Sequence, residues 1–429
     1  MRIGVIHRYM ICRAVCCLAV IMTSVCTVAR TYRTAVFSDD VKTLQIIVNN
    51  DQLSQPIVSL GGDDELSIEF DELTYVNSNF YYKIVQCNAD WSVSQLSSME
   101  YLDGLDQNQI HDYEYSVNTT VNYIHYRLIL SREDVKITRS GNYAVLIARD
   151  NDFDDGLVAC ACFSVVEPLA QLGVAVTGNT MLELNGRFQQ LTITSVVGDV
   201  NPANIMTDFL LVINQNGRPD TERIISRPTY LRGKEMEYVN SKDLVFEGGN
   251  QYRSIDFSSR FTYGAGIDHI EFFADEYQVV LDPSMSRRGV ESAYNQDAFG
   301  GFVVNLQGNE YDATEADYMR VHFTYPADVP LINEDIYLLG AMSYNTLDVC
   351  TRLMYDMDNK TYIGNLLLKQ GGYNFVYATM NKYSSALSLY DTEGSLWSTR
   401  NLYNVYLYYR PMGARYDRLV GYTSFVSQR

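Results

Sequence analysis

The stretch that decides the fold is YYKIVQCNADWSVSQLSSMEYLDGLDQNQIHDYEYSVNTTVNYIHYRLIL, which runs from Tyr81 to Leu130. Its start, together with the preceding residue, gives a tyrosine-rich run from Phe80 to Val85. Its end alternates between two sets of residues, namely Tyr123, His125, Arg127 and Ile129 in one set and Ile124, Tyr126, Leu128 and Leu130 in the other. Both patterns are typical of β-strands. The long connection contains Asn88, Asp90 and other residues that hydrogen-bond to backbone or tolerate positive φ. We therefore expect a loop of fixed shape rather than a linker.

The rest of the chain repeats this character. From Val41 onward, short alternating or aromatic-rich segments recur between Gly, Asn and Asp turns, and no stretch keeps helical spacing over several turns. This predicts an all-β protein, and 429 residues suggest two to four domains. Glu167-Pro168 and Pro326 with Pro330 mark boundaries, because proline cannot donate to a strand ladder. We predict three tandem immunoglobulin-like β-sandwich domains at residues 35–168, 169–326 and 327–429.

Residues 1–29 are predicted to be a secretory signal peptide. They contain Arg2, Arg8 and Arg13 and no acidic residue, and their apolar run is too short to anchor the chain in a bilayer. We place the cleavage site near Ala29. A lipoprotein is the alternative reading, with Cys26 as the best lipidation candidate.

Four cysteines follow the predicted signal: Cys87, Cys160, Cys162 and Cys350. Cys160 and Cys162 are two positions apart on a predicted strand, so they share a face but lack good geometry for bridging each other. We expect buried free thiols, and a cross-strand disulfide remains open.

The charge of the chain restricts its partners. The formal net charge is −19, and it becomes −22 once the three arginines of the predicted signal are removed. Nucleic acid is therefore excluded as a partner. An acidic surface keeps a secreted protein soluble and monomeric, and docking to a basic partner is the alternative use.

The sequence offers no convincing catalytic, cofactor or metal motif. Asp150 to Gly156 resembles a calcium loop, but the glycine is one position late and Ala161 stands where a bidentate Glu is needed, so we predict an acidic turn. His125 and His322 fall in strand patterns without zinc spacing, and we interpret them as hydrogen-bonded sheet residues. No Gly-x-Ser-x-Gly elbow is present. We therefore predict that the protein is not an enzyme.

Several motifs resemble those of a known family. In the first predicted domain they are CNADW (Cys87 to Trp91), EYLDG (Glu100 to Gly104), DYEYSVNTT (Asp112 to Thr120) and YIHYRL (Tyr123 to Leu128). They resemble the N-terminal domain of the plug protein family of the Bacteroidota type IX secretion system. The likeness continues as far as YYRPMGARYDRLVGY (Tyr408 to Tyr422), so it covers essentially the whole chain after the signal.

The resemblance implies a periplasmic plug at the inner face of the outer membrane, not itself an integral membrane protein and monomeric when free. Such a protein binds the periplasmic mouth of the large outer-membrane β-barrel translocon and seals it when no cargo is engaged. We expect the contact to involve the polar loop of residues 88–109. The residues that we predict to bind the partner are Asn88, Asp90, Trp91, Glu100, Tyr101 and Asp103.

The alternative function is a secreted or surface-associated glycan-binding protein. Residues 336–378 are similar to sandwich modules found beside starch-active enzymes, which bind sugar through exposed tryptophans. Tyr344 stands where the usual aromatic-Asn pair would begin, and Trp397 is the only tryptophan in the third predicted domain. This departure weakens the glycan hypothesis, because such sites need aromatic platforms.

Overall fold

A computed structural model describes residues 31–130, 135–290, 297–307 and 313–427. The signal peptide predicted at residues 1–29, including Cys26, lies outside the described residues. The prediction of an all-β, multi-domain sandwich fold is confirmed, since the described chain consists mainly of antiparallel strands with only two short α-helices. Residues from Tyr32 onward form one compact unit that contains three sandwiches.

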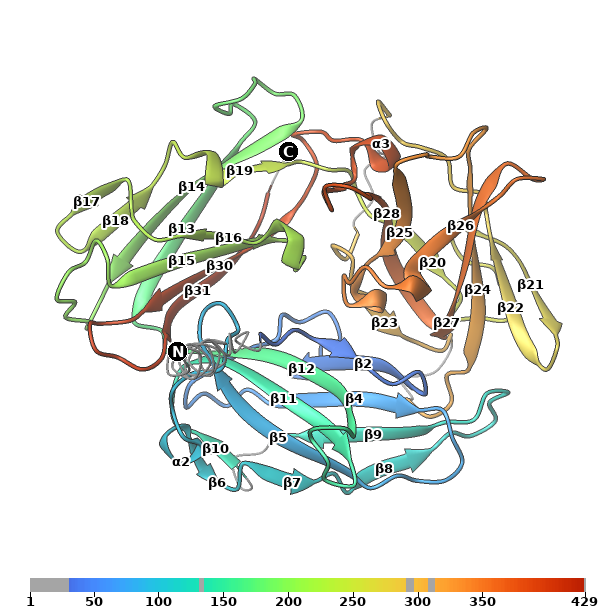
Figure 1. The fold of residues 1–429 in the computed structure, drawn as a ribbon, viewed down its shortest axis with the longest axis horizontal. Coiled ribbons are helices and arrows are strands. Elements are labelled where there is room, and N and C mark those ends of the chain that lie inside the picture. The colour runs from blue at the N-terminus through green and yellow to red at the C-terminus, as the bar shows by residue number, and fades with distance from the viewer. Residues whose placement is uncertain (1–30, 131–134, 291–296, 308–312, 428–429) are drawn as a thin grey trace, which may run out of the picture. The chain divides into compact units, whose positions relative to one another are not determined.

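The first sandwich has two sheets that enclose one apolar core (Figure 1). Its elements are β1 (Ala35–Val36), β2 (Val41–Val48), β3 (Ile57–Ser59), β4 (Leu66–Glu72), β5 (Phe80–Cys87), α2 (Ser98–Tyr101), β6 (Leu102–Gly104), β7 (Gln107–Gln109), β8 (Asp112–Tyr115), β9 (Ile124–Ile129), β10 (Val135–Ile137), β11 (Gly141–Arg149) and β12 (Leu157–Val166). One sheet has the order β1-β12-β11-β5-β7, with β3 added to β12, and the other has the order β2-β4-β9-β8. β6 and β10 form a separate pair.

The two strands expected from the decisive stretch are present as β5 and β9, one in each sheet. Their aromatic residues hold the sheets together: the rings of Phe80 and Tyr126 lie 4.8 Å apart edge to face, and both contact Phe70. All three side chains are fully buried. Aromatic pairs of this kind stabilise a core by about 0.5–1.5 kcal/mol beyond the area that they bury.

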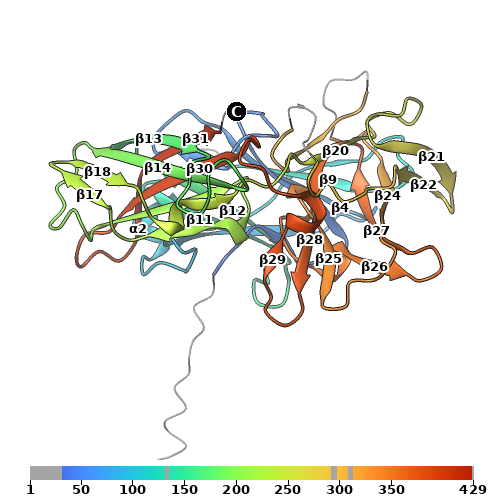
Figure 2. The same ribbon diagram turned by 90° about the horizontal axis from the view of Figure 1, so that it is seen from above.

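The second sandwich combines strands from two distant parts of the chain. Its elements are β13 (Ala170–Thr177), β14 (Phe188–Val197), β15 (Phe209–Gln215), η1 (Pro219–Thr221), β16 (Arg223–Ile225), β17 (Tyr230–Arg232), β18 (Glu235–Tyr238), η2 (Lys242–Leu244), β19 (Val245–Glu247), β30 (Leu402–Tyr409) and β31 (Arg418–Val426). The sheet orders are β13-β14-β18-β17, with β19 added to β14, and β16-β15-β30-β31. The turned view shows β30 and β31 beside β13 and β14 (Figure 2).

The third sandwich is one ten-stranded sheet folded around its own core. Its elements are β20 (Arg253–Asp256), β21 (Ile267–Phe273), β22 (Glu276–Leu281), β23 (Phe302–Val304), β24 (Tyr318–Pro326), β25 (Glu334–Leu339), η3 (Ala341–Ser343), η4 (Val349–Thr351), β26 (Arg352–Asp356), β27 (Thr361–Lys369), β28 (Gly371–Asn381), β29 (Leu387–Ser388) and α3 (Tyr390–Glu393). The main order is β20-β28-β25-β26-β27-β24-β22-β21, and β23 and β29 pair with β28.

Strand pairing divides the later part of the chain differently from the boundary predicted at residues 326 and 327. β24 pairs with β27 from Tyr318 opposite Lys369 to Pro326 opposite Thr361, so residues on both sides of that boundary share one sheet. β30 instead pairs with β15, with Phe209 opposite Tyr409. Pro326 occupies the last position of β24, where proline ends a strand without ending a domain.

Candidate partner-binding site

The loop of residues 88–109 begins with a closed turn. The amide of Trp91 donates to the carbonyl of Asn88 at 3.0 Å, and the amide of Ser92 donates to Asp90 Oδ1 at 3.0 Å. Trp91 adopts φ of 63°, and its side chain packs against the buried cysteine cluster on the outer face of the sheet. The Asp side chain thus stabilises the turn locally, as expected for this residue type.

The inner side of this loop is attached to the β30–β31 connection. The buried amide of Ala89 donates to Asp417 Oδ2 at 2.9 Å, and the amide of Gln95 donates to the carbonyl of Arg415 at 3.2 Å. Arg415 also donates to the Glu100 carboxylate. The backbone hydrogen bond from Ser97 and the contact with Arg415 lower the pKa of Glu100 to about 2. The loop is therefore an ordered part of the compact unit.

The six residues predicted to bind a partner are not equally accessible. Tyr101 is buried, and its hydroxyl donates to the carbonyl of Ile84 at 3.1 Å. Three of the six are partly buried, namely Asn88, Trp91 and Glu100, and two are exposed, namely Asp90 and Asp103.

The loop also exposes apolar side chains that the sequence reasoning missed. Met99 is 92% exposed and Leu105 is 67% exposed. Met99 follows directly after the first residue of α2, where a helix of four residues leaves this side chain without a covering neighbour. Asp90, Met99, Asp103 and Leu105 are exposed members of the loop, and we call this set the outer loop face. Whether this face binds a partner stays a prediction.

A buried polar cluster joins the first and third sandwiches. Lys369 Nζ on β27 lies 2.6 Å from Asp71 Oδ2 on β4, and both side chains are at most 2% exposed. The hydroxyl of Tyr318 donates to the same Asp71 oxygen at 2.7 Å, and His125 Nδ1 lies 2.7 Å from the other oxygen. Lys369 Nζ also lies 4.1 Å from the ring centre of Tyr123. Each sandwich thus supplies one charge of a pair that is shielded from water.

This cluster shifts the ionisation of its members. Burial alone would raise the pKa of Asp71, but the Lys369 charge and the hydrogen bond from His125 outweigh it, so the pKa lies below its ordinary value. Burial alone would lower the pKa of His125, but hydrogen bonds to Asp71 and Glu69 outweigh it and raise the pKa. The carboxylate is therefore held in its charged form.

Two further contacts join the same sandwiches. Asp317 Oδ2 accepts hydrogen bonds from the amide and the hydroxyl of Thr120, at 2.9 and 2.8 Å. The hydroxyl of Tyr123 donates to the carbonyl of Ala316 at 2.7 Å. Thr120 and Tyr123 lie in or beside the motifs that carry the family resemblance, so those motifs support the contact between sandwiches.

The first and second sandwiches meet through a smaller polar contact. Asn142 on β11 donates to the carbonyl of Asn88 at 3.0 Å, and its Oδ1 accepts from the hydroxyls of Ser164 and Tyr408, both at 2.8 Å. Asn142 and Tyr408 are buried. Because buried polar groups with complete hydrogen bonding specify a single arrangement, these contacts favour a rigid body.

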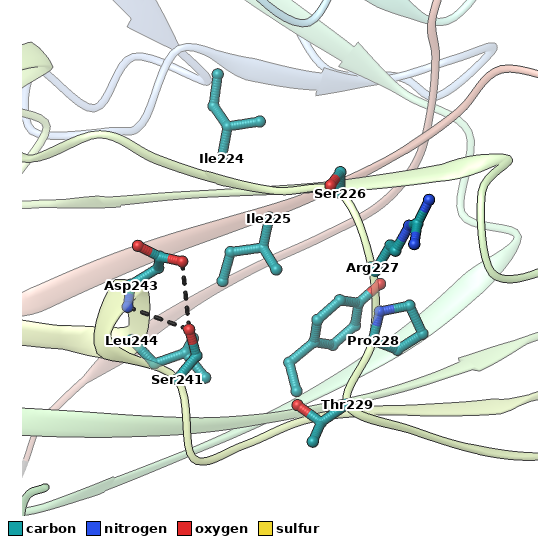
Figure 3. A pocket seen from close by; sticks show the side chains of 10 residues that line it. Ile224, Ile225, Ser226, Arg227, Pro228, Thr229, Ser241, Asp243 and Leu244 are labelled. Atoms are coloured by element: carbon teal, nitrogen blue, oxygen red, sulfur yellow. Dashed lines mark hydrogen bonds between the residues drawn. The ribbon is translucent and has the colours of Figure 1, made fainter.

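A pocket of about 340 Å³ lies in the second sandwich, between β16 and η2 (Figure 3). Pro228, Tyr238 and Leu244 are its buried lining residues, and Arg227 and Asp243 lie on opposite sides of it in this view. The amide of Asp243 donates to Ser241 Oγ at 3.2 Å. The hydroxyl of Ser241 donates to Asp243 Oδ2 at 3.3 Å, and the lining includes neither histidine nor cysteine.

The aromatic residues of the glycan hypothesis are placed unfavourably for binding sugar. Tyr344 packs against the first core, and its hydroxyl accepts the amide of Leu44 at 3.0 Å. Trp397 is partly buried, with its ring directly against the Gly178 backbone: a Cβ on Gly178 would come within 2.5 Å of it. Neither residue forms an exposed platform of the kind that sugar binding requires.

The remaining motifs form local structure. Asp152 Oδ1 accepts the amides of Asp154 and Asp155, each at 3.1 Å, so this carboxylate closes the acidic turn that we predicted. His322 Nε2 lies 2.7 Å from Gln278 Oε1 on the neighbouring strand, which confirms its interpretation as a hydrogen-bonded sheet residue. Across the described ranges, no group of three or more His, Cys, Asp or Glu side chains is arranged to hold a metal ion.

Three of the four cysteines follow the expectation of buried free thiols, and Cys350 departs from it because it is exposed. Cys160 and Cys162 are buried on the same face of β12, with their Sγ atoms 3.8 Å apart, at hydrogen-bond distance and without a disulfide bond. Cys87 is also buried and free, whereas Cys350 is exposed. Burial raises the pKa of the Cys87 thiol to about 12, so the thiol stays protonated and unreactive.

Comparisons with known proteins match the chain to a family model and to solved structures. Residues 41–167, nearly the whole first sandwich, match the family model described as type 9 secretion system plug protein 1st domain. Among solved structures, the chain is similar to a hypothetical protein from Parabacteroides merdae ATCC 43184, whose crystal structure has 2.30 Å resolution. The two are 36% identical with a TM-score of 0.89, covering 93% of this chain and all of that one. No curated protein matches the chain.

One further observation concerns membranes. In the part of the chain that the structure describes, every helix is too short or too polar to cross a bilayer.

Proposed function

The chain belongs to the type 9 secretion system plug protein family, and from this membership we propose that it is a periplasmic plug that binds the periplasmic mouth of the type IX outer-membrane translocon. It seals the translocon when no cargo is engaged. The plug proteins form a family of non-enzymatic secretion components, which agrees with our proposal that this protein acts by binding and not by catalysis. The match of the first sandwich to the family is the observation that carries the proposal.

The rigidity of the body supports a sealing role. A plug that covers a wide pore by surface complementarity must keep its shape, because a swinging domain would reopen the pore. Here the buried pair of Asp71 and Lys369 and the hydrogen bonds of Asn142 connect the first sandwich to the other two. Such contacts favour one fixed arrangement over several.

We further propose that the outer loop face contributes to the contact. It combines exposed carboxylates with the exposed apolar side chains of Met99 and Leu105. Reversible complexes commonly use a mixed polar and apolar surface of moderate size. The inner side of the loop is anchored, so binding at its outer side costs little conformational entropy.

The first experiment is a pull-down with the tagged full chain from detergent-solubilised outer membranes. Recovery of the large barrel supports the plug proposal, and its absence overturns it. A deletion strain gives an independent readout: loss of the plug is expected to admit large hydrophilic compounds that the outer membrane normally excludes, and expression of the chain restores the barrier. An unchanged barrier contradicts the sealing role.

A matched pair of variants tests the outer loop face. Met99→Ser with Asp103→Lys changes this face, whereas Met357→Ser with Asp358→Lys changes another exposed Met and Asp, on the β26–β27 turn. We expect only the first pair to weaken recovery of the barrel. If both variants recover the barrel equally, the plug proposal stands and the assignment of this face is wrong.

A further inference from the structure

The outermost strand of the third sandwich has a free edge. β21 ends the strand order of the ten-stranded sheet and pairs with β22, and no other described strand pairs with it. Figures 1 and 2 both place β21 at the outer margin of this sandwich. An unpaired edge presents main-chain N–H and C=O groups that can pair with another strand.

The register identifies which main-chain groups face outward. Phe273 and Glu276 flank a two-residue turn in which Ala274 and Asp275 have φ of 55° and 65°, the geometry of a type I′ hairpin. Hydrogen-bonded and non-hydrogen-bonded residue pairs alternate away from such a turn. The main-chain N–H and C=O of Phe273 therefore bond to β22, whereas those of Phe272 point to the open edge. By the same alternation the main-chain N–H and C=O of Ile270 point to the open edge.

A side-chain contact agrees with this register. The hydroxyl of Tyr263 reaches the carbonyl of Ile270 at 3.5 Å, which places that carbonyl on the open edge. A contact this long is readily exchanged for the shorter hydrogen bond of an incoming strand.

The edge strand itself exposes aromatic side chains. Phe272 is 56% exposed and Phe273 is 68% exposed. Phe272 contacts Tyr277 of β22 with ring centres 5.0 Å apart. Edge strands are usually protected by lysine, proline or a bulge, but here the register shift lies between Ile267 and His269 and leaves the second half of the strand unprotected.

The charges beside the edge define the occupant. Asp268, Glu271 and Asp275 are exposed, and residues 267–281 contain no lysine or arginine. One cation, Arg260 of the preceding loop, lies over the Tyr277 ring of β22 and donates to its hydroxyl, so three carboxylates face one guanidinium here. A strand with basic side chains complements this edge, whereas a second copy of a chain of charge −19 brings like charge to it. We propose that the outer edge of β21 accepts an extended, basic segment of a partner protein as an additional strand. This mode combines main-chain hydrogen bonds with side-chain pockets, and it does not depend on the proposed plug function.

The test uses the full chain and two synthetic peptides, one alternating lysine with valine and one alternating glutamate with valine. Hydrogen exchange resolved to single residues reports pairing directly. We expect the basic peptide at about 1 mM to slow exchange of the Ile270 and Phe272 amides about tenfold. The Glu271 and Phe273 amides, already bonded to β22, keep their rates. Absence of protection, or equal protection by the acidic peptide, overturns the proposal.

Two variants at one position separate main-chain pairing from side-chain contact. Phe272→Ala and Phe272→Pro both remove the ring, but only the proline removes the outward N–H, a change that edge strands tolerate. We expect protection of Ile270 to survive in the alanine variant and to disappear in the proline variant. If the basic peptide protects the Ile270 amide equally in both variants, and the melting temperature of the protein is unchanged, strand addition is contradicted. A concentration-dependent dimer that only the proline variant abolishes would assign the edge to a second copy instead.

Discussion

Replacing Lys369 by methionine removes the cation of the buried pair while nearly keeping the side-chain volume. At the observed 2.6 Å and an effective dielectric constant of about 20, the attraction between the two charges is about 6 kcal/mol. Part of this attraction offsets the desolvation of both groups. Removing one partner of such a pair leaves the other charge buried, and the net cost is about 3–5 kcal/mol.

The stability lost in the Lys369→Met variant depends on pH in a defined direction. Lys369 and His125 hold the folded pKa of Asp71 below its ordinary value, so its stabilising contribution is present above the unfolded pKa of about 3.9. That contribution is lost as the pH falls through the folded pKa. The difference between the wild type and Lys369→Met is therefore expected to be largest near neutral pH and to shrink in acid, where the carboxyl group of the variant becomes protonated.

Urea unfolding followed by tryptophan fluorescence measures this difference. Trp91 reports on the first sandwich and Trp397 on the region beside the second. The control is Lys369→Met combined with Asp71→Asn, which removes both charges and is expected to recover more than half of the lost stability. A single variant within about 1 kcal/mol of the wild type, or a double variant no more stable than the single one, would refute the reasoning.

Three further changes test other parts of the structure. His125→Asn is expected to flatten the dependence of stability on pH. Burial opposes the charged imidazole, but its carboxylate partners outweigh burial and raise the folded pKa of His125. The stabilising contribution of His125 is therefore complete below the unfolded pKa of about 6.5 and is lost as the pH rises through the folded pKa. Urea midpoints from about pH 5 to 9 measure this, and an unchanged slope contradicts it. Asp417→Ala leaves the buried amide of Ala89 without its acceptor and is expected to cost about 1–3 kcal/mol, with faster exchange of that amide; retained protection would argue against the anchored loop. Gly248→Ala would place a Cβ 2.1 Å from a backbone oxygen and is expected to lower the melting temperature more than Gly249→Ala, whose Cβ meets open space and which adds only the backbone strain of an alanine at φ of 62°; equal shifts would be inconsistent with the close packing at Gly248.

Local strand patterns were predictable from the sequence because they depend on neighbouring residues. Phe80 to Val85 and Tyr123 to Leu130 alternate or are rich in aromatics, and both became strands. The return of β30 to β15 was not predictable, because strand pairing between distant segments leaves no local signature. The sequence around Pro326 suggests a domain boundary for the same reason. The missing N–H of a proline ends a strand, but it does not determine which sheet the next strand joins.

The buried polar cluster was missed because charged side chains were assumed to lie at the surface. One signal was available: β4 reads LSIEFDE, and all seven of its residues are buried, including Glu69 and Asp71. Three acidic residues in a strand between apolar neighbours could have suggested buried partners. The accessibility of the predicted loop residues was not predictable either, because it depends on the β30–β31 connection more than 300 positions away.

The pairing of β15 with β30 also sets an order of events during synthesis. Asn214 and Asn404, which face each other across these strands, are 190 positions apart, and the third sandwich lies between them in the chain. The first sandwich can close as soon as β12 has left the ribosome. The second must wait, with its β15 edge exposed, until β31 has emerged, and contacts of such high sequence separation form slowly. During that interval the unpaired edge is the part of the molecule most open to aggregation or to capture by a chaperone.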